Sequence, residues 1–501
     1  MIKRILSFTV SVMAAMAVNH VAADTVELTK AGTLKDAVAT PASVTSLAVS
    51  GPMNAADFDF INRSMTNLVS IDLTGANIEA YSGSPVLTGY SASPADVLPA
   101  YALHGMKLTS VALPASVATL GEGSLAGIAA TTLSLPAVTT VGEGAFAGAT
   151  KLASVSLASS DVTLGSLAFA GCSSLGSVTL AADRLPEGAF KNCTSLKSVT
   201  LSPALESIGK DAFMGCSSLE TFDFGASLAD IGDGAFEGSG LTAADMSAST
   251  SLTSVGEWAF ARCGALASVI MPESVQTVGQ GAFFDDASLT SVVLPDGLST
   301  VEDYMMTGNT SLNSVTLIPA RAETIGRYAY KGMSSMEHVT IPAGVSYIGD
   351  NAMEGMTSLS DIDANSLKTV PDLGQDVWKD VNQPEISLLV ADADTGNLFK
   401  DADQWKEFKI DIPSGAQDIV ISDNDDMADV KVRFEGRVLV ISASAGIKDA
   451  VVGGLNGVLI PATSMSADRA SFDTSGFGED FYTVSVTTSD GRKGQFKLLR
   501  K

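Results

Sequence analysis

One phrase recurs along most of this 501-residue chain at a nearly fixed spacing. In residues 141–157 it reads VGEGAFAGATKLASVSL: a branched apolar residue, glycine, two spacers, Ala-Phe, a spacer, glycine and an alternating apolar run. Close copies stand at 208–219, 231–238, 255–266 and 278–289. A sequence unit that is repeated many times predicts a stacked array, in which each repeat contacts its neighbours and no central core is needed.

The phase of the repeat predicts its class. Aligned on the phenylalanine, equivalent positions are 21 to 24 residues apart, a period typical of leucine-rich repeats. They are Leu103, Leu125, Phe146, Phe169, Phe190, Phe213, Phe236, Phe260, Phe283, Met306, Tyr330 and Met353. The alternating run predicts one short strand per repeat. The expected fold is therefore a leucine-rich repeat solenoid with a parallel β-sheet on one face and irregular or short helical turns on the other.

Two positions that recur within the phrase are predicted to be structural. The phenylalanine column should fill the wide side of each repeat. Glycines should allow tight backbone bends where a Cβ would be unfavourable. They are Gly142, Gly209, Gly232, Gly256, Gly279, Gly326 and Gly349.

The remaining segments differ in pattern and predict the domain organisation. Residues 24–100 are read as an N-terminal cap with the first irregular repeats, 101–370 as the regular array, and 371–413 as a C-terminal cap containing Trp378 and Trp405. Residues 414–501 hold alternating apolar segments separated by Gly, Asp and Asn turns. That pattern predicts a small antiparallel β-sandwich.

The first residues have the composition of a targeting segment. Lys3 and Arg4 precede an apolar run over 5–18, and small residues stand before Asp24. This predicts a signal peptide over 1–23 with cleavage between Ala23 and Asp24. No later stretch offers about 18 uninterrupted apolar residues, so no transmembrane segment is expected in the mature chain. We therefore expect an exported protein, extracellular or on the outer cell surface.

The charge balance excludes one class of partner. The chain has a formal net charge of −26. Such an excess of acid repels nucleic acid and anionic membranes, so neither is an expected partner. The same acidity is also explained by solubility alone.

The four cysteines share one phase. Cys172, Cys193, Cys216 and Cys263 each stand three residues after the repeat phenylalanine. Neighbouring repeats lie about 4.8 Å apart, which permits a disulfide between neighbours without requiring one. Buried free thiols in an internal ladder are favoured over one bridge with the remainder unpaired.

The outward side of the predicted sheet is the candidate binding face. Its side chains are small and rich in hydroxyls, and aromatic residues are nearly absent from it. The candidate residues are Ser154, Ser177, Ser198, Thr200, Thr221, Asp223, Ser268, Ser291, Ser314, Thr316, His338 and Thr340. A flat surface of this length suits a protein partner. The alternative is that Ser and Thr only solubilise the sheet and form cross-strand contacts.

Catalytic and cofactor signals are missing from the sequence. No His/Cys or His/carboxylate cluster has metal-ligand spacing, and there is no phosphate-binding glycine loop or serine nucleophile elbow. Asp423 to Asp426 lack the glycine and distal glutamate of a calcium loop. The chain is therefore expected to be a non-enzyme without metal or cofactor.

The motifs resemble a known family. The phrase at 208–219 (IGKDAFMGCSSL) and Thr-Ile-Pro at 340–342 resemble the BspA-like bacterial surface leucine-rich repeat family over about residues 24–410. The resemblance implies a secreted or surface protein, without catalytic residues, that binds host or bacterial proteins.

The last block has a resemblance of its own. Residues 455–457, 482–484, 490–491 and 497–501 resemble the C-terminal sorting domains of type IX secretion, although Glu479 and Asp480 stand where a glycine usually precedes the tyrosine.

Three functions are weighed. The favoured one is adhesion to, or recognition of, a protein ligand through the repeat face by a monomeric chain. A structural scaffold of the envelope is the alternative. A glycan-binding protein is least favoured, because the outward face lacks aromatics and paired carboxylates.

Overall fold

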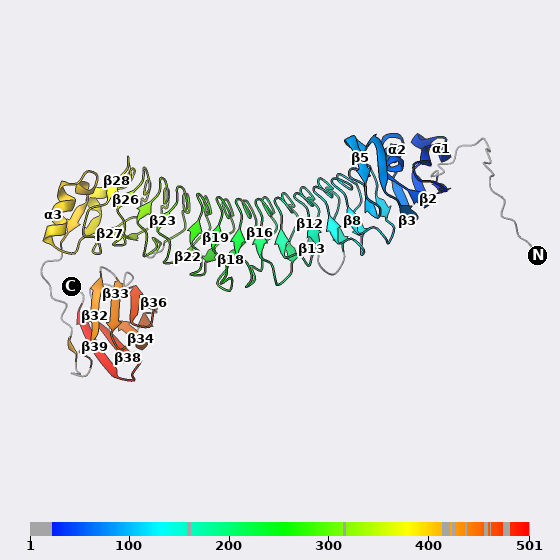
Figure 1. Ribbon diagram of the computed structural model, residues 1–501. Helices are drawn as coiled ribbons and strands as arrows, with labels where there is room; N and C mark the ends of the chain where they lie inside the picture. The colour runs from blue at the N-terminus through cyan, green and yellow to red at the C-terminus, as the bar shows by residue number, and fades with distance from the viewer. Residues whose placement is uncertain are drawn as a thin grey trace, which may run out of the picture. The chain divides into compact units, whose positions relative to one another are not determined.

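The repeated phrase forms a stack of short parallel strands, as the sequence predicts (Figure 1). The computed structural model describes residues 23–157, 162–313, 317–412, 421–422, 427, 429–435, 438–454, 459–460, 462–473 and 481–499. The chain divides into two compact units, Met1–Leu219 and Glu220–Lys501. The predicted signal peptide lies outside the described residues except for Ala23, which begins the first strand.

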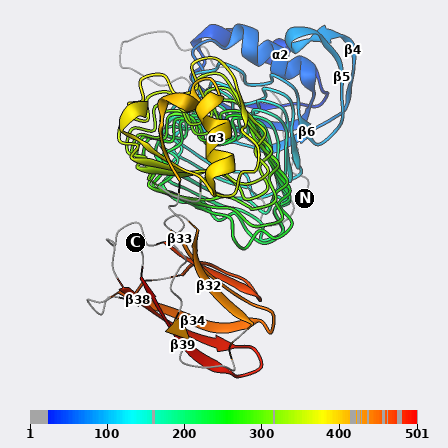
Figure 2. The same ribbon diagram turned by 90° about the vertical axis from the view of Figure 1, so that its left-hand side faces the viewer.

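The first unit opens with longer elements than the repeats that follow. Strands β1 (Ala23–Glu27), β2 (Ser46–Met53) and β3 (Ser70–Ile78) pair in parallel, beside helices α1 (Leu34–Ala37) and α2 (Ala55–Ser64). Asn54 caps helix α2 by accepting a hydrogen bond from the N–H of Ala56 at 3.0 Å. An antiparallel hairpin, β4 (Tyr81–Val86) with β5 (Tyr90–Ser93), contacts α2 (Figure 2).

In the array, most repeats contribute two strands rather than the one predicted. In the first unit the three-residue strands are β7 (Ser110–Ala112), β9 (Thr132–Ser134), β11 (Ser154–Ser156), β13 (Ser177–Thr179) and β15 (Ser198–Thr200). The second series has two residues per strand: β6 (Val97–Leu98), β8 (Thr119–Leu120), β10 (Thr140–Val141), β12 (Thr163–Leu164), β14 (Arg184–Leu185) and β16 (Ser207–Ile208). The second series ends at the branched residue that opens each phrase, directly before the glycine in most repeats.

The second unit continues both series. Its three-residue strands are β18 (Ala243–Asp245), β20 (Ser268–Ile270), β22 (Ser291–Val293), β25 (His338–Thr340), β27 (Asp361–Asp363), β29 (Ser387–Leu389) and β30 (Lys409–Asp411). Its two-residue strands are β17 (Asp230–Ile231), β19 (Ser254–Val255), β21 (Thr277–Val278), β23 (Thr300–Val301), β24 (Thr324–Ile325), β26 (Tyr347–Ile348) and β28 (Asp372–Leu373).

The phenylalanine column is interior, as predicted. All of its aligned members, from Leu103 to Met353, are 0 or 1% exposed. In the first unit the rings of Phe146 and Phe169 stack at 4.9 Å, and those of Phe190 and Phe213 at 5.4 Å. In the second unit Phe236 and Phe260 stack at 5.3 Å. Ring stacking between neighbouring repeats therefore adds to the burial that holds each unit together.

The glycine column is required for a reason different from the predicted one. Gly142 has no positive φ, but a Cβ there would lie 2.7 Å from the backbone oxygen of Leu120 in the preceding repeat. The left-handed backbone occurs two residues later, where Gly144 has φ of 56°. The first glycine thus permits close approach of neighbouring repeats, and the second permits the bend.

The C-terminal end of the array is closed by large side chains, as predicted. Helix α3 (Ala393–Asp401) lies across the last repeats of the second unit (Figure 2). Trp378 and Trp405 are 2% and 1% exposed and pack edge to face at 5.3 Å, together with Phe399 and Phe408. The indole N–H of Trp405 donates to the carbonyl of Pro371 at 3.2 Å. These rings cover an apolar end that further repeats would otherwise bury.

The C-terminal block is a two-sheet antiparallel β-domain. One sheet has the order β31 (Ile421–Ser422), β39 (Lys493–Leu499), β38 (Phe481–Thr488), β34 (Ile447–Gly454), β35 (Leu459–Ile460). The other has the order β32 (Val430–Glu435), β33 (Val438–Ala443), β37 (Arg469–Asp473), β36 (Ala462–Met465). A buried cluster that includes Leu439, Phe472 and Tyr482 forms its core. The exact domain boundaries drawn from the sequence stay predictions.

Candidate functional site

The outward side chains of the three-residue strands, here called the sheet face, form aligned hydroxyl columns. Ser177 pairs in register with Ser198, and Thr179 with Thr200. Ser154, Ser177, Ser198, Thr200 and Ser291 are exposed, whereas Ser268, His338 and Thr340 are half-buried. Ser314 and Thr316 lie outside the described residues. The structure therefore places eight of the predicted face residues on strands of the array.

Two predicted face residues lie in a different setting. Thr221 and Asp223 are exposed, but residues 220–225 form no strand. The reason is the residue between them: Phe222 stands where other repeats carry valine, and its ring meets those of Phe224 and Phe236, each at 5.1 Å. The bulky ring replaces a branched side chain that would fit the short strand, and the assignment of these two residues to a sheet is wrong.

His338 belongs to the most densely bonded polar group on the sheet face. Its Nδ1 lies 2.7 Å from the Oδ2 of Asp361, which pairs with it in register on β27. Ser360 donates its hydroxyl to the same carboxylate oxygen at 2.8 Å, and Glu337 lies 3.8 Å from Nε2. Both the serine and the aspartate engage the same side of the imidazole. The Ser360 hydroxyl oxygen also lies 3.4 Å from Nδ1. These contacts fix the orientation of the ring.

The described residues contain neither a metal cluster nor a membrane-spanning helix. No group of three His, Cys, Asp or Glu side chains within them could hold a metal ion. Among the helices that the structure describes, none is long and apolar enough to cross a bilayer.

The cysteines occupy the interior, as favoured. In the part of the chain that the structure describes, Cys172, Cys193, Cys216 and Cys263 are free and 0% exposed. Each thiol lies 3.1 or 3.2 Å from a backbone carbonyl of the preceding repeat, such as Cys216 Sγ to the oxygen of Phe190. Burial raises the pKa of the Cys263 thiol to about 12, with a further contribution from the charge of Asp286. These thiols are therefore packing groups with low reactivity.

A second surface carries aromatic residues that the sequence analysis did not single out. The segment from each glycine to the end of the following Ala-Phe-x-Gly, here called the turn edge, holds half-buried Trp258, Phe284, Tyr304 and Tyr328 in the second unit. Trp258, Tyr304 and Tyr328 stand two residues before the buried ring column. The signal was present in the sequence as an aromatic residue recurring at one phase.

The first unit has one aromatic at the same phase. Tyr101 donates its hydroxyl to Glu122, and Tyr90 of the hairpin donates to the same carboxylate. These bonds lower the pKa of Glu122. The bond to Glu122 is the main reason why the pKa of Tyr101 rises to about 12. Here the tyrosine ties the hairpin to the array.

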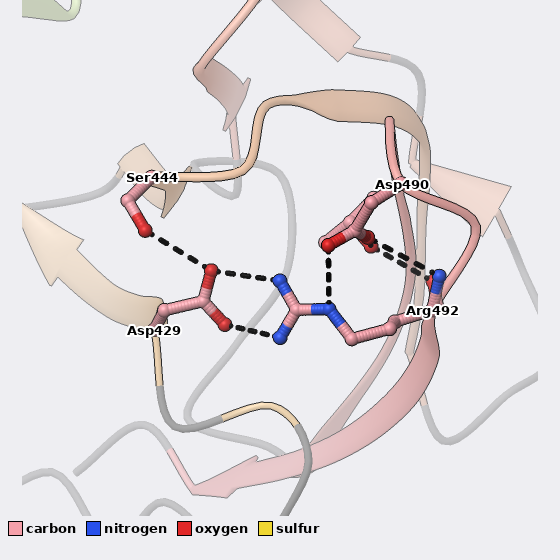
Figure 3. Close-up of polar contacts among 5 residues, drawn as sticks. Asp429, Ser444, Asp490 and Arg492 are labelled. Atoms are coloured by element: carbon pink, nitrogen blue, oxygen red, sulfur yellow. Dashed lines mark hydrogen bonds and ion pairs between the residues drawn. The ribbon is translucent and has the colours of Figure 1, made fainter.

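The densest ion-pair network lies in the C-terminal β-domain (Figure 3). Arg492 donates to both carboxylate oxygens of Asp429, at 2.6 and 2.9 Å, and to Asp490 at 2.8 Å. Ser444 donates to Asp429 as well. The bond from Arg492 is the largest cause of the strongly lowered pKa of Asp429. The network joins three chain segments of the domain, which is a structural role.

The turns of the second unit frame one open polar pocket of about 390 Å³ near the C-terminal cap. It is lined by Gln375, Asp376, Trp378, Lys379, Gln383 and Gln404. The side-chain amide of Gln404 accepts from the N–H of Val377 and donates to the carbonyl of Gly374. The pocket wall is thus part of the cap.

Comparison with known proteins places the array in a family. The family model described as a BspA type leucine-rich repeat region matches residues 96–184, 183–313 and 253–383, which together cover more than half of the chain. The chain belongs to the BspA-type leucine-rich repeat family. The sequence resemblance to this family is confirmed. No curated protein matches the chain.

Several solved structures resemble this BspA-type chain. A leucine-rich repeat protein from Bacteroides ovatus ATCC 8483 is 18% identical, with a TM-score of 0.47, over 74% of this chain and 84% of that one. A leucine-rich cell surface protein from Faecalibacterium prausnitzii A2-165 is 22% identical, with a TM-score of 0.31, over 56% and 86%. The pneumococcal vaccine antigen PcpA is 14% identical, with a TM-score of 0.35, over 73% and 79%.

Proposed function

We propose that this BspA-type protein is a secreted or surface-exposed binding protein without enzymatic activity, and that its sheet face recognises a protein ligand. The observation that carries the proposal is the exposed, in-register hydroxyl columns on β11, β13 and β15. Short hydroxyl side chains leave the backbone accessible and form hydrogen bonds without steric bulk. Membership of a family that includes surface proteins supports the location.

The test places large charged side chains on the face. The double variant Ser177→Arg with Ser198→Arg adds bulk to adjacent strands. The control is Thr150→Arg with Ser195→Arg, which adds the same charge at exposed turn positions. Binding of the purified chain to whole bacteria and to arrayed extracellular-matrix proteins should fall for the first pair and persist for the second. Equal binding by both pairs would remove the sheet face from the proposal.

A scaffold role is separated by a deletion in register. Ser177 and Ser198 are partners on neighbouring strands, so removing residues 177–197 deletes one repeat and preserves the pairing phase. A spacer tolerates this change, whereas a binding face of matched length loses affinity. Retained binding together with retained folding would favour the scaffold.

For the C-terminal β-domain we propose a sorting role. The two-sheet antiparallel architecture is compatible with that role, and two of the matched segments lie on β38 and in the β38–β39 turn. Residues 455–457 and Arg500 and Lys501 lie outside the described residues. A reporter fused to residues 414–501 should be exported by a host with type IX secretion, and a reporter retained in the periplasm would count against the role.

A further inference from the structure

The four aromatic side chains on the turn edge of the second unit touch one another across successive repeats. Trp258 meets Phe284 edge to face at 5.4 Å and Tyr304 at 6.3 Å. Tyr304 stacks on Tyr328 at 4.9 Å. We call these four residues the aromatic strip. Because the rings hold one another in place, little side-chain freedom remains to be lost when a partner binds.

The backbone beneath the strip adopts an unfavourable conformation for these residues. Trp258, Tyr304 and Tyr328 have φ of 57°, 60° and 57°, in the left-handed region. The repeats on either side of Trp258 carry Gly234 and Gly281 at this position, whereas the repeat after Tyr328 carries Asn351 with φ of 54°. A residue other than glycine there costs about 1 kcal/mol. Burial of half of each ring contributes a stabilisation of about the same size, roughly 1 kcal/mol, so the rings are held at this position without a net penalty.

One repeat departs from the phrase at a second position. Glu302 stands where its neighbours have Gly279 and Gly326, and it directly precedes Asp303 and Tyr304. A Cβ at Gly279 would lie 2.5 Å from the nitrogen of Glu257 and one at Gly326 would lie 2.6 Å from the nitrogen of Asp303, so side chains are disfavoured at this phase. An exposed glutamate at a crowded position brings charge to the strip with no packing benefit.

The ring faces are already occupied, which argues against a sugar ligand. The ring of Tyr328 meets Tyr304 and also the Lys331 ammonium, 5.1 Å from its centroid. The ring of Phe284 meets Trp258 and also the Arg262 guanidinium, at 5.4 Å. A pyranose stacks on a free ring face, whereas Tyr328 and Phe284 each have a basic side chain over the ring. Aromatic side chains in such mixed polar settings are enriched in protein interfaces.

The charges around the strip are unbalanced. Each basic side chain is paired with an acid: Arg262 with Glu237, Arg327 with Asp303, and Lys331 with Glu354. In contrast, Glu257, Asp285 and Glu302 are exposed and form no ion pair with any residue that the structure describes. Burial raises the pKa of Glu302, and the charges of Asp303 and Glu257 raise it further. A cationic partner would relieve this repulsion.

We propose that the aromatic strip, with Glu257, Asp285 and Glu302, docks a segment of a partner protein in which lysine or arginine alternates with apolar side chains. The apolar groups pack on the ring edges and the cations pair with the three carboxylates. The net charge of −26 steers such a basic segment toward the chain. This surface is separate from the sheet face and does not depend on the function proposed for it.

The experiment uses the full chain and a short fluorescent peptide that alternates arginine and leucine. Its charge control alternates glutamate and leucine. The key variant is Trp258→Gly with Tyr304→Gly, because glycine is the residue that neighbouring repeats use at this left-handed position. Anisotropy should show binding of the basic peptide only, weakened about tenfold or more by the double variant, as for an interface hot spot.

Matched charge variants separate docking from general attraction to an acidic protein. Glu257→Gln with Glu302→Gln removes two charges beside the strip, and Glu323→Gln with Asp372→Asn removes two exposed charges beside β24 and β28. The first pair should weaken binding of the basic peptide and make the affinity less dependent on salt concentration. The second pair should change the affinity and its salt dependence only as much as the loss of two net charges does. Circular dichroism checks that each variant folds.

Three results would overturn the proposal. The first is that both pairs of charge variants lose the same affinity for the basic peptide. The second is that the peptide binds as before when Trp258 and Tyr304 are replaced by glycine. The third is that the chain binds a neutral oligosaccharide instead of the basic peptide, and that this binding requires Trp258. The sheet-face pair Ser177→Arg with Ser198→Arg should leave binding to the strip intact. A negative result for the aromatic strip can therefore be told apart from a negative result for the sheet face.

Discussion

The position three residues after the ring column is filled differently in the two units. In the first unit it holds Cys172, Cys193 and Cys216 in successive repeats, each with its thiol near a backbone carbonyl. In the second unit it holds Ser239, Cys263, Asp286 and Asn309. All of these residues are buried. Met333 and Met356 follow at the same position in later repeats and are buried as well. This interior column is thus nearly apolar in the first unit and contains polar side chains in three repeats of the second.

In the second unit, polar side chains of this column accept hydrogen bonds from backbone N–H groups of the preceding repeat. The N–H of Cys263 donates to Asp286 Oδ1 at 2.7 Å, and the N–H of Asp286 donates to Asn309 Oδ1 at 2.9 Å. The other oxygen of Asp286 is buried without a hydrogen-bond partner in the described structure. The repeat therefore accommodates these polar side chains where each one links neighbouring repeats, and only one of the two carboxylate oxygens of Asp286 is hydrogen-bonded.

The largest effect is expected from the ring column. Phe190→Ala removes a ring stacked between Phe169 and Phe213, at 5.4 Å from each, and should lower the free energy of unfolding by about 3–5 kcal/mol. Met306→Ala at the equivalent position of the second unit should cost about 2–4 kcal/mol, since methionine is more adaptable. Urea titration of both variants measures the difference. A larger loss for Met306→Ala would show that ring stacking adds nothing to the first unit.

The next effect is a pH dependence confined to the polar column. Burial raises the pKa of Asp286 from 3.8 to about 8. The folded chain therefore holds this proton more tightly than the unfolded chain. The contribution of the protonated Asp286 carboxyl to the free energy of unfolding is fully present below pH 4 and is lost as the pH rises toward 8. Asp286→Asn should match the wild type near pH 4 and exceed it by a few kcal/mol at pH 9.

The measurement is urea unfolding of both proteins across that pH range. Because groups away from Asp286 titrate alike in the pair, and burial keeps the pKa of Cys263 well above this pH range, the difference mainly reports Asp286. Cys216→Ser, which places a hydroxyl in the thiol column of the first unit, provides the control and should show no such slope. A constant difference between Asp286→Asn and the wild type from pH 4 to 9 would mean that the carboxylate is ionised inside the fold.

Much of this architecture follows from the phase of the sequence. The ring column and the buried cysteines follow from residues that recur at one phase of the repeat, which is the strongest sequence signal. The C-terminal cap follows from the bulky Trp378 and Trp405 where the repeat ends. The second strand series was missed because two residues carry no periodicity. Residues 220–225 were wrongly assigned to a strand because Phe222 fits the apolar pattern of the sequence, whereas its ring is larger than the valine that other repeats have at this position.

The candidate surfaces were harder to predict than the core. The hydroxyl columns could be read from strand alternation, but exposure depends on neighbours, and His338 is half-buried by Asp361 and Ser360. The aromatic strip was missed because contacts between residues 24, 26 and 46 positions apart appear only when the repeats are stacked. A search for aromatics at one phase, rather than on the predicted sheet, would have found it.

A smaller effect tests a feature common to both units. Gly142→Ala and Gly279→Ala each place a Cβ against the backbone of the preceding repeat, at 2.7 Å and 2.5 Å from its nearest atom. Both should lower stability by about 1–3 kcal/mol through overpacking. Gly264→Ala is the control, since a Cβ there meets nothing within 4 Å. Thermal unfolding that spares Gly142→Ala alone would show that the first unit packs its repeats more loosely.

The smallest effect concerns the thiols. Cys216→Ala removes one sulfur and its contact with the carbonyl of Phe190 at 3.1 Å, which should cost about 1 kcal/mol. Cys263→Ala should cost slightly more, because its thiol also lies 3.3 Å from the Ser239 hydroxyl in the polar column. Burial raises the thiol pKa in both columns, so a thiol reagent should modify neither until urea opens the array. Peptide mapping without reductant gives the opposing outcome. A disulfide between Cys172 and Cys193 would mean that the thiols of the first unit are crosslinked rather than free. The two units would then differ at this column in covalent bonding rather than in hydrogen bonding.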